Sequence, residues 1–414
     1  MHVERGTGRL YNPAVGVCTT YRARFVVPVE MPTIENGFVE TANGRIVAVG
    51  PWDRASRKDV IDLGDSVLLP GFVNPHAHLE LSCYAGQIAP CNLWDWLLRM
   101  VAMRKAPGGI EREREGVRRG AKLSLEAGVT TVGDISRSHL AWPILKASPL
   151  RKVCFAELLC FAEEPARTVD ELADKVRETQ TDARLLAGIS PHAPYSVTAE
   201  QLRACVTMAR RQRLPLTIHV AETIEERQYI ESGCGFLGDL MSVTGFASHC
   251  PPPRQPLFDH LGTSGLFGSP ALLAHVNYIT DGELDRLARS PCSVAYCPRA
   301  HRYYGHAPHR FRDMLARGIN VCTGTDSLAA NESLSILDEL RFLHREHPDL
   351  DAGLLLEMGT LRSARALGLD GVVGSLVPGK RADLTAVPLA EPGTTDPRRD
   401  ILESDKAPRF VAVG

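Results

Sequence analysis

Two histidines, His76 and His78, stand two residues apart after an apolar segment and could bind one metal ion together. They follow the apolar run at residues 67–70. If that run is a strand, side chains two positions apart project to the same face. Neutral imidazoles are common ligands of divalent metals. A lone histidine pair is more often a metal-free pair at a turn, so this hypothesis depends on the rest of the chain.

Other short apolar runs also end in residues that could bind a metal or move a proton. These runs lead to His192, to His219 with Glu222 three residues later, to His275 and to Asp326. Apolar runs of about four to eight residues bounded by turn signals are typical of buried strands. In a (β/α)8 barrel the chemistry lies at the C-terminal ends of the strands. We therefore expect these side chains to meet at one end of a barrel.

Strands and helices that could position these groups alternate along the middle of the chain. Barrel strands are expected near residues 67–73, 130–135, 153–159, 185–190, 216–220, 272–276, 293–297 and 320–325. Helices are expected near residues 112–127, 169–179, 199–211, 282–290, 311–317 and 333–346, and two of them follow the cap residues Thr198 and Thr280. Residues 245–270 are rich in proline and glycine and predict a long irregular connection. This alternation predicts an α/β fold built on a TIM barrel.

Both ends of the chain have strand composition. Residues 22–29 and 44–50 near one end, and 379–387 and 409–413 near the other, are rich in strand formers and flanked by turn signals. Because chain termini often lie close together, we predict a small composite β-sandwich of residues 1–69 and 372–414. Residues 70–371 would then form the barrel.

Composition and charge narrow the function classes. The chain has 414 residues, and its 47 Lys+Arg against 49 Asp+Glu give a net charge of -2, which offers no long-range attraction for nucleic acid or anionic membrane. No apolar run approaches the roughly 20 residues that span a bilayer. Residues 1–6 lack the apolar core of a signal peptide, and the 11 cysteines are scattered, as is usual for reduced thiols. We expect a cytoplasmic protein that acts on a small molecule, with neither nucleic acid nor membrane as a partner.

The candidate metal ligands are His76, His78, His219 and Asp326. Three nitrogens and one carboxylate oxygen suit zinc or iron(II) better than calcium or magnesium. A bound ion of this kind can lower the pKa of a water ligand to about 7, which makes hydroxide available at neutral pH. The four residues therefore predict one catalytic metal centre.

Two further residues could handle protons beside that centre. Glu222 could accept the proton of the water and deliver it to the substrate. The alternative is that Glu222 is a carboxylate in the first turn of a helix, where the helix dipole favours it. His275 could hold the hydroxide or polarise the atom under attack. His192 is expected to contact substrate, because four metal ligands are already found without it.

Together these motifs resemble those of the amidohydrolase superfamily. The matching segments are PGFVNPHAH at residues 70–78, SPHAPY at 190–195, HVAET at 219–223, LAH at 273–275, GTDS at 324–327 and GSLVPGKRADL at 374–384. The resemblance is strongest to the branch of metal-dependent deaminases and triazine chlorohydrolases. Within it, residues 78–81, 93–97 and 297–301 are similar to aminodeoxyfutalosine deaminase-like proteins.

The resemblance implies a set of roles for the residues already named. It implies one divalent ion, zinc or iron, on His76, His78, His219 and Asp326, with Glu222, His275 and Asp326 acting in proton transfer. Family branches that hold two metals bridge them with a lysine at a strand end, and none is expected at that place here. By family analogy alone, the protein could be a homo-oligomer.

Five residues are candidates for substrate contact, and each has a structural alternative. They are His192, Glu80, Trp94, Arg299 and His301. Trp94 could stack on a planar ring or pack in the core, and Glu80 could reach substrate or make a structural hydrogen bond. The chlorohydrolase-like branch commonly reads Cys-Pro-x-Ser-Asn where residues 297–301 of this chain read Cys-Pro-Arg-Ala-His. Arg299 and His301 could bind a polar or anionic group or lie in a solvated loop.

Three functions fit these residues. The first is hydrolytic deamination of a purine-like or other nitrogen heterocycle, for which an acid beside the metal would protonate the ring. The second is hydrolysis of a cyclic amide or dechlorination of an aromatic heterocycle on the same scaffold. The third is a metal-binding protein without catalysis. Release of ammonia would separate the first from the other two.

Overall fold

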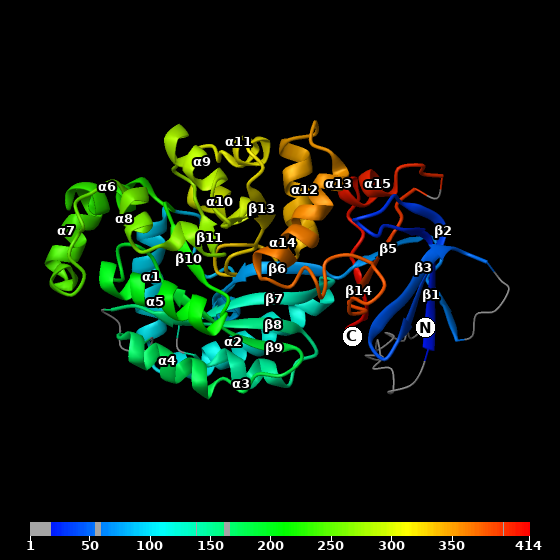
Figure 1. Ribbon diagram of the computed structural model, residues 1–414, viewed down its shortest axis with the longest axis horizontal. Coiled ribbons are helices and arrows are strands. Elements are labelled where there is room, and N and C mark those ends of the chain that lie inside the picture. The colour runs from blue at the N-terminus through cyan, green and yellow to red at the C-terminus, as the bar shows by residue number, and fades with distance from the viewer. Residues whose placement is uncertain (1–17, 54–58, 138, 161–165, 392) are drawn as a thin grey trace.

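The computed structural model describes residues 18–53, 59–137, 139–160, 166–391 and 393–414. Within these residues, parallel strands form a barrel at the centre of the molecule (Figure 1). They are β6 (Phe72–Ala77), β7 (Val129–Ser136), β8 (Arg151–Leu158), β9 (Leu185–Pro191), β10 (Thr217–Val220), β11 (Leu272–His275), β12 (Ser293–Tyr296) and β13 (Asn320–Thr323). Nearly every residue in them is buried, which explains why their sequences are continuous apolar runs.

Two four-stranded sheets close to make this barrel. The strand orders are β6-β7-β8-β9 and β10-β11-β12-β13, and all their pairings are parallel. A bridge between Ile189 and Leu216 joins β9 to β10, and a bridge between Ala77 and Asp326 joins β6 to the segment after β13. The predicted TIM barrel is confirmed.

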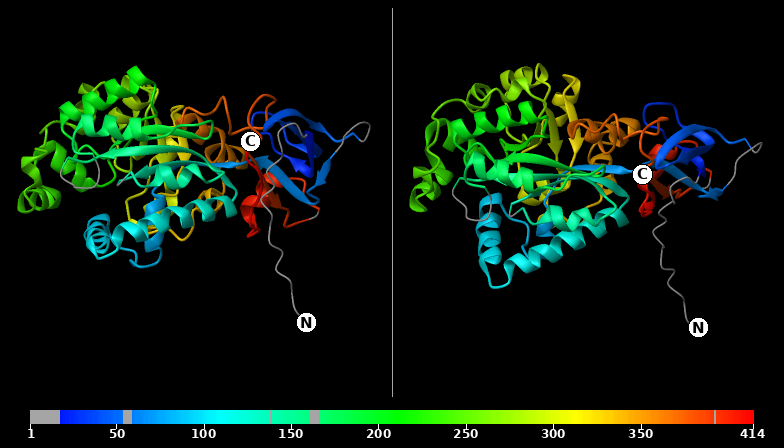
Figure 2. Two further views of the ribbon diagram at one scale, coloured as in Figure 1. Left: turned by 90° about the horizontal axis from the view of Figure 1, so that it is seen from below. Right: turned by 60° about the horizontal axis from the view of Figure 1, so that its bottom comes forward.

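Helices follow the strands and cover the outside of the barrel (Figures 1 and 2). The α-helices are α1 (Leu93–Lys105), α2 (Gly109–Glu126), α3 (Ala141–Lys146), α4 (Val169–Glu178), α5 (Ala199–Gln212), α6 (Ile224–Ser232), α7 (Gly235–Val243), α8 (Leu257–Thr263), α9 (Asp281–Ala288), α10 (Pro298–Tyr304), α11 (Phe311–Ala316), α12 (Ile336–Glu346), α13 (Ala352–Met358), α14 (Leu361–Ala366) and α15 (Pro397–Glu403). Short 3-10 turns are η1 (Leu79–Tyr84), η2 (Phe246–Ser248) and η3 (Leu266–Gly268). Capping boxes at Thr198 and Thr280 begin α5 and α9 as predicted. In the part of the chain that the structure describes, no helix has the length and apolar character to cross a membrane.

A separate sheet at one end of the molecule combines strands from both ends of the chain (Figure 1). Its strands are β1 (Cys18–Val26), β2 (Ile34–Ala42), β3 (Arg45–Pro51), β4 (Val60–Asp62), β5 (Ser66–Pro70), β14 (Leu384–Pro388) and β15 (Arg409–Ala412). The order is β15-β14-β5-β1-β2-β3, and β4 pairs with β1. The prediction that the two chain ends share one β-structure is confirmed, while residues 1–17 and 54–58 of the predicted sandwich lie outside the described residues.

Two sequence-based expectations were wrong in detail. The strand expected at 67–73 is divided, because Ser66–Pro70 is β5 of the end sheet and the barrel strand starts only at Phe72. Gly71 makes the junction: a Cβ placed there would lie 2.1 Å from Oγ1 of Thr130, so only glycine fits this close approach. The expected irregular connection at 245–270 contains α8, whose apolar residues Leu257 and Leu261 are fully buried in the core.

A buried ion pair connects the barrel to the end sheet. Arg151 begins β8, and its Nε donates to Oδ2 of Asp383 at 3.1 Å. The side chains are only 3% and 2% exposed. Asp383 also accepts the backbone N–H of Gly414 at 2.9 Å. This contact anchors the C-terminal end of the chain against the start of a barrel strand.

Candidate active site

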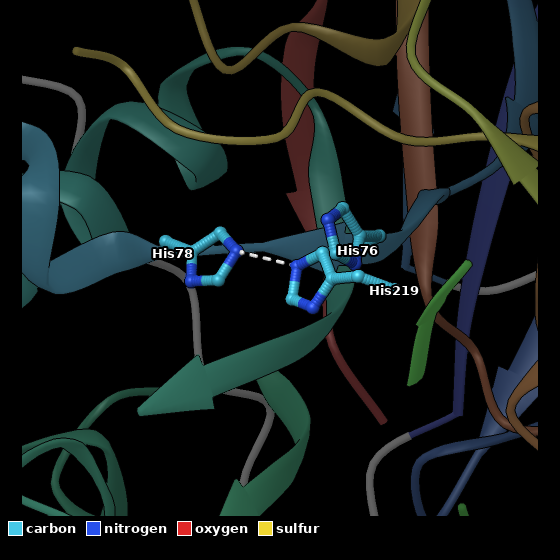
Figure 3. Close-up of side chains that lie close together, drawn as sticks. All are labelled: His76, His78 and His219. Atoms are coloured by element: carbon cyan, nitrogen blue, oxygen red, sulfur yellow. Dashed lines mark hydrogen bonds between the residues drawn. The ribbon is translucent and has the colours of Figure 1, made fainter. Parts of the chain in front are cut away.

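Three histidine rings meet at the C-terminal end of the barrel (Figure 3). His76 lies in β6, His78 directly follows this strand, and His219 lies in β10. Nε2 of His219 lies 3.4 Å from Nε2 of His78. One ring nitrogen from each histidine lies within 4.8 Å of the other two. Because β6 and β10 belong to different sheets, this cluster exists only in the closed barrel.

The three rings are poised to act as metal ligands. Both ring nitrogens of His76 are buried, and neither hydrogen-bonds to another described residue. Burial lowers the pKa of His76 and His78 well below 6.5 and that of His219 to about 4, so the rings are neutral. Nδ1 of His219 donates to the carbonyl oxygen of His192 at 2.8 Å, which leaves its Nε2 lone pair facing the cluster. Three neutral imidazoles that each place one ring nitrogen within 4.8 Å of the other two fit a divalent ion.

Asp326 lies beside the cluster and is buried. Its Oδ1 is 3.7 Å from Nε2 of His78 and 3.9 Å from Nε2 of His76. Its backbone N–H donates to the carbonyl oxygen of His76 at 3.2 Å, which connects the last barrel strand to the first. Burial raises the pKa of Asp326 to about 7. A cation beside this carboxylate would favour its ionised form.

Glu222 and His275 form a pair beside the histidine cluster. Oε1 of Glu222 lies 3.5 Å from Nε2 of His275. The His275 ring centroid is 5.1 Å from that of His76 and 5.5 Å from that of His219. Burial raises the pKa of Glu222 well above 4.5, and burial lowers the pKa of His275 well below 6.5. A carboxyl group that can hold its proton therefore lies beside a neutral imidazole, as general acid–base chemistry requires.

The backbone is strained where these side chains leave the strands. Positive φ angles occur at Ala221 (50°), His275 (69°), Val276 (54°) and Asp326 (56°), none of which is glycine. Each such residue costs about 1–3 kcal/mol and persists only where the surrounding structure holds it. At Val276, for example, the backbone is held by a hydrogen bond from its N–H to the carbonyl oxygen of Val220, at 2.9 Å. Strained backbone therefore occurs at the strand ends that carry the candidate catalytic groups.

His192 lies beside the cluster together with a carboxylate that the sequence analysis missed. The ring centroids of His192 and His219 are 5.0 Å apart, and Nδ1 of His192 lies 2.7 Å from Oγ of Ser196. Glu157, near the end of β8, places a carboxylate oxygen within 4.8 Å of ring nitrogens of His192 and His219. These three residues form a second group with metal-ligand spacing, and the two groups share His219.

Aromatic rings extend from the cluster to α1. Trp94 is 4% exposed, and its ring centroid lies 5.8 Å from that of Tyr195. Tyr195 in turn lies 5.7 Å from the ring of His192. Nε1 of Trp94 donates to Oε2 of Glu225 at 3.3 Å. The row from Trp94 to His192 makes Trp94 a neighbour of the site, and its stacking on a substrate stays a prediction.

Glu80 has strong protein partners inside the barrel end. Its side chain is 1% exposed, and Oε1 accepts from Nη2 of Arg104 at 2.8 Å. Oε2 accepts from Oγ of Ser136 at 3.2 Å. Arg104 also pairs with Glu113 at 2.9 Å. The structure thus shows the structural hydrogen bonds that the sequence analysis kept as an alternative, and substrate contact by Glu80 stays a prediction.

Arg299 and His301 also bond to protein groups. Nη1 of Arg299 donates to Oγ of Ser333 at 2.9 Å, and Nη2 pairs with Glu332 at 2.7 Å. Nδ1 of His301 lies 3.1 Å from Oδ1 of Asn277. Both residues lie on α10, which replaces the solvated loop considered from the sequence. No described contact joins Arg299 to the histidine cluster, whereas His301 contacts Asn277, whose Nδ2 donates to the carbonyl oxygen of Glu222.

Three residues near the centre escaped the sequence analysis: Glu157, Glu226 and Asn277. Glu157 was visible as the one charged residue in the otherwise apolar run at residues 153–159. Glu226 stands three residues after Thr223, which is the spacing of an N-terminal helix cap. Asn277 has no local signal, because its contacts are made with distant parts of the chain.

A TIM barrel with a histidine cluster and a carboxyl–imidazole pair at its C-terminal end defines a class of metal-dependent hydrolases. The chain belongs to the amidohydrolase family, whose model matches residues 67–413. The 5-methylthioadenosine/S-adenosylhomocysteine deaminase of Nitratidesulfovibrio vulgaris is 31% identical over 385 residues, which cover 87% of this chain and 80% of that protein. The predicted resemblance is confirmed, and the protein is an amidohydrolase.

Solved structures share the fold over almost its whole length. The aminofutalosine deaminase of Helicobacter pylori, in complex with methylthio-coformycin, has a TM-score of 0.83 at 23% identity and covers 94% of this chain and 97% of its own. The adenosine deaminase of Xanthomonas campestris with bound zinc has a TM-score of 0.82 at 24% identity, with coverages of 95% and 91%. These similarities agree with the barrel and with the end sheet described above.

Proposed function

We propose that this protein is a metal-dependent deaminase, which removes the exocyclic amine of an adenosine-like purine. The observation that carries the proposal is the Glu222 carboxyl group, 3.5 Å from His275 and beside the three-histidine cluster. Ring deamination needs an acid that can protonate the heterocycle next to the attacked carbon. The name of the Nitratidesulfovibrio vulgaris relative, a deaminase of two adenosine derivatives, supports this substrate class.

We infer a single divalent ion, zinc, held by His76, His78, His219 and Asp326. When bound, the ion would supply an activated water for the attack. The unpartnered nitrogens of His76 support this assignment. In family branches that hold two ions, a lysine at a strand end bridges them. Lys152 lies instead at the start of β8, where it donates to the carbonyl oxygens of Ser148 and Leu150 at 3.0 and 2.8 Å, and this supports a single ion.

The side chains around this ion would divide the proton transfers. Glu222 would accept a proton from the attacking water and pass it to the ring nitrogen beside the attacked carbon. His275 would orient the water through its ring nitrogen. Asp326 would accept the second proton of the water and pass it to the departing amine. Overall, the water oxygen forms a bond to the ring carbon, the bond from that carbon to the amine breaks, and the amine leaves as ammonia.

Substrate contacts are proposed along the aromatic row beside the cluster. Trp94 and His192 would line one side of the purine, because Tyr195 connects their rings. Substrate contacts are also proposed for Glu80, Arg299 and His301. Each of these side chains would contact the substrate while keeping its hydrogen bond to a protein group.

We also propose that residues 70–371 form the catalytic domain and that residues 1–69 and 372–414 form the composite domain. The end of β5 at Pro70 and the return of the chain in β14 at Leu384 support these limits.

Release of ammonia from a panel of amines tests the proposed reaction. The zinc-loaded protein would be incubated with adenosine, 5-methylthioadenosine, S-adenosylhomocysteine, aminodeoxyfutalosine, cytosine and aminotriazines, with a chelator-treated sample as control. We expect zinc-dependent ammonia from at least one adenosine derivative. Silence across the panel, with one zinc still bound per chain, would contradict deamination and favour hydrolysis of a cyclic amide or a halide.

A further inference from the structure

We propose that Glu226 and Asn277 are positioning residues, which hold the backbone of Glu222 from both sides and thereby fix its carboxyl group against His275. The inference rests on the proposed function, because it assigns Glu222 the proton transfers. Neither residue is a candidate catalytic residue, since neither touches the histidine cluster in any described contact.

Glu226 holds the N-terminal side of Glu222. Its Oε1 accepts the backbone N–H of Ala221 at 3.1 Å, and its Oε2 accepts that of Glu222 at 2.9 Å. The side chain is 1% exposed, and the N–H of Glu226 itself donates to Oγ1 of Thr223 at 3.1 Å. One buried carboxylate therefore binds two consecutive N–H groups with both its oxygens.

This arrangement acts on the strained part of the chain. Ala221 has a φ of 50°, and the turn after β10 has to be held by its surroundings. The two oxygens of this one side chain satisfy both backbone N–H groups, which would otherwise lack a partner at a cost in stability. Glu226 thus stabilises the strained backbone at Ala221, the residue directly before Glu222.

Asn277 holds the C-terminal side. Its Nδ2 donates to the carbonyl oxygen of Glu222 at 2.9 Å. The orientation of the amide is set by His301, whose Nδ1 lies 3.1 Å from Oδ1 of Asn277. Asn277 stands two residues after His275, so one short segment carries both His275 and the group that holds Glu222.

The same type of contact occurs elsewhere without a site beside it. Oε2 of Glu171, in α4, accepts the backbone N–H groups of both Arg167 and Thr168, at 2.7 and 3.3 Å, and its surroundings are exposed. Asn320, at the opposite end of the barrel, donates to the carbonyl oxygen of Arg362 at 3.0 Å. Glu171 and Asn320 therefore supply matched controls for Glu226 and Asn277.

The first test compares Glu226→Gln with Glu171→Gln. Glutamine keeps the size of the side chain, but its NH2 group faces one of the two N–H donors instead of accepting from it. For Glu226→Gln we expect kcat to fall about 100-fold, as displacement of a reacting group by about 1 Å can cause. KM and zinc content should stay at the wild-type values, and Glu171→Gln should keep the wild-type kcat. A Glu226→Gln enzyme with unchanged kcat overturns the proposal.

A second variant and a structural measurement keep the proposal testable if Glu226→Gln does not fold. Asn277→Asp removes the donor to the Glu222 carbonyl oxygen, and Asn320→Asp is its control. We expect a lower kcat with unchanged zinc content for Asn277→Asp only. Crystal structures should show Oε1 of Glu222 farther from Nε2 of His275 than the present 3.5 Å in either site variant. An unchanged distance in both variants overturns the proposal.

The structural measurement also separates this inference from the proposed reaction. If the wild-type protein releases no ammonia from any compound, deamination fails as the function. The distance between Glu222 and His275 in the variants still decides whether Glu226 and Asn277 position Glu222.

Discussion

Oε1 of Glu222 lies 3.5 Å from Nε2 of His275, although Glu222 follows β10 and His275 is the last residue of β11. The contact is possible because β10 and β11 are neighbours, with Val220 paired to His275 in register. Glu222 stands just past that register position, and the positive φ at Ala221 turns the chain there. The positive φ of Ala221 and the register of β10 with β11 together bring Glu222 and His275 into contact as the proposed proton-transfer pair.

Glu222→Gln should abolish turnover without removing the metal. Glutamine has nearly the same shape but cannot accept and release a proton, and loss of general acid–base catalysis typically costs about 10²- to 10⁴-fold in rate. Ammonia release and metal analysis on the same sample would measure both effects. Glu231→Gln, an exposed position on α6, is the control and should keep its activity. Wild-type turnover in Glu222→Gln would remove Glu222 from the mechanism.

His219→Gln and His192→Gln should differ in metal content. We expect zinc affinity to fall more than about 100-fold for His219→Gln, since changes in the outer partners of a ligand already cost about 10- to 100-fold. His192→Gln should keep its zinc and raise KM. The zinc content of both variants after dialysis against a weak chelator would measure this difference. Loss of zinc from His192→Gln to the same degree would instead favour the group of Glu157, His192 and His219 as the metal site.

Asp383→Asn should destabilise the whole protein. The substitution leaves the Arg151 guanidinium buried without its charged partner, and breaking a buried pair in this way costs about 3–5 kcal/mol of unfolding free energy. Urea unfolding followed by circular dichroism would measure the change. Asp349→Asn, which breaks the exposed pair with Arg312, should leave the midpoint unchanged. Equal effects of the two substitutions would refute a role for the buried pair.

His139 should make stability depend on pH. Its side chain is 8% exposed, its Nε2 lies 3.2 Å from Oγ1 of Thr179, and burial lowers its pKa from 6.5 to about 4. Between these two values the unfolded chain binds a proton at His139 and the folded protein does not. Stability should therefore fall as the pH decreases from about 6.5 to 4, by up to about 3 kcal/mol from this residue.

Thermal melting across this pH range tests the contribution of His139. His139→Gln should reduce the loss of melting temperature at low pH, whereas His249→Gln, at an exposed position, should melt with the wild-type pH dependence. The same pH dependence in His139→Gln and the wild type would show that His139 does not titrate in this way.

Most of the barrel was predictable because buried parallel strands carry continuous apolar runs. Residues 185–190 and 320–325 show this clearly, since β9 and β13 lie within one or two residues of the expected limits. The run at 67–73 misled the prediction because it crosses Gly71, where the chain passes from the end sheet to the barrel. Two adjacent strands of different sheets have the same local composition, so only their hydrogen-bonded partners distinguish them.

The sequence by itself determined which chemical groups stand at the strand ends: the imidazoles of His76, His78 and His219 and the carboxyl groups of Glu222 and Asp326. Residue type and the length of apolar runs are local properties, and they place such groups without knowledge of the fold. Only the tertiary structure decided their partners. Closure of the barrel brings β6 to β10. The pairing of β10 with β11 places Asn277 against the Glu222 carbonyl oxygen, and Arg299 pairs with Glu332. Hydrogen bonds between distant segments depend on distances of a few tenths of an ångström, which no local pattern in a sequence encodes.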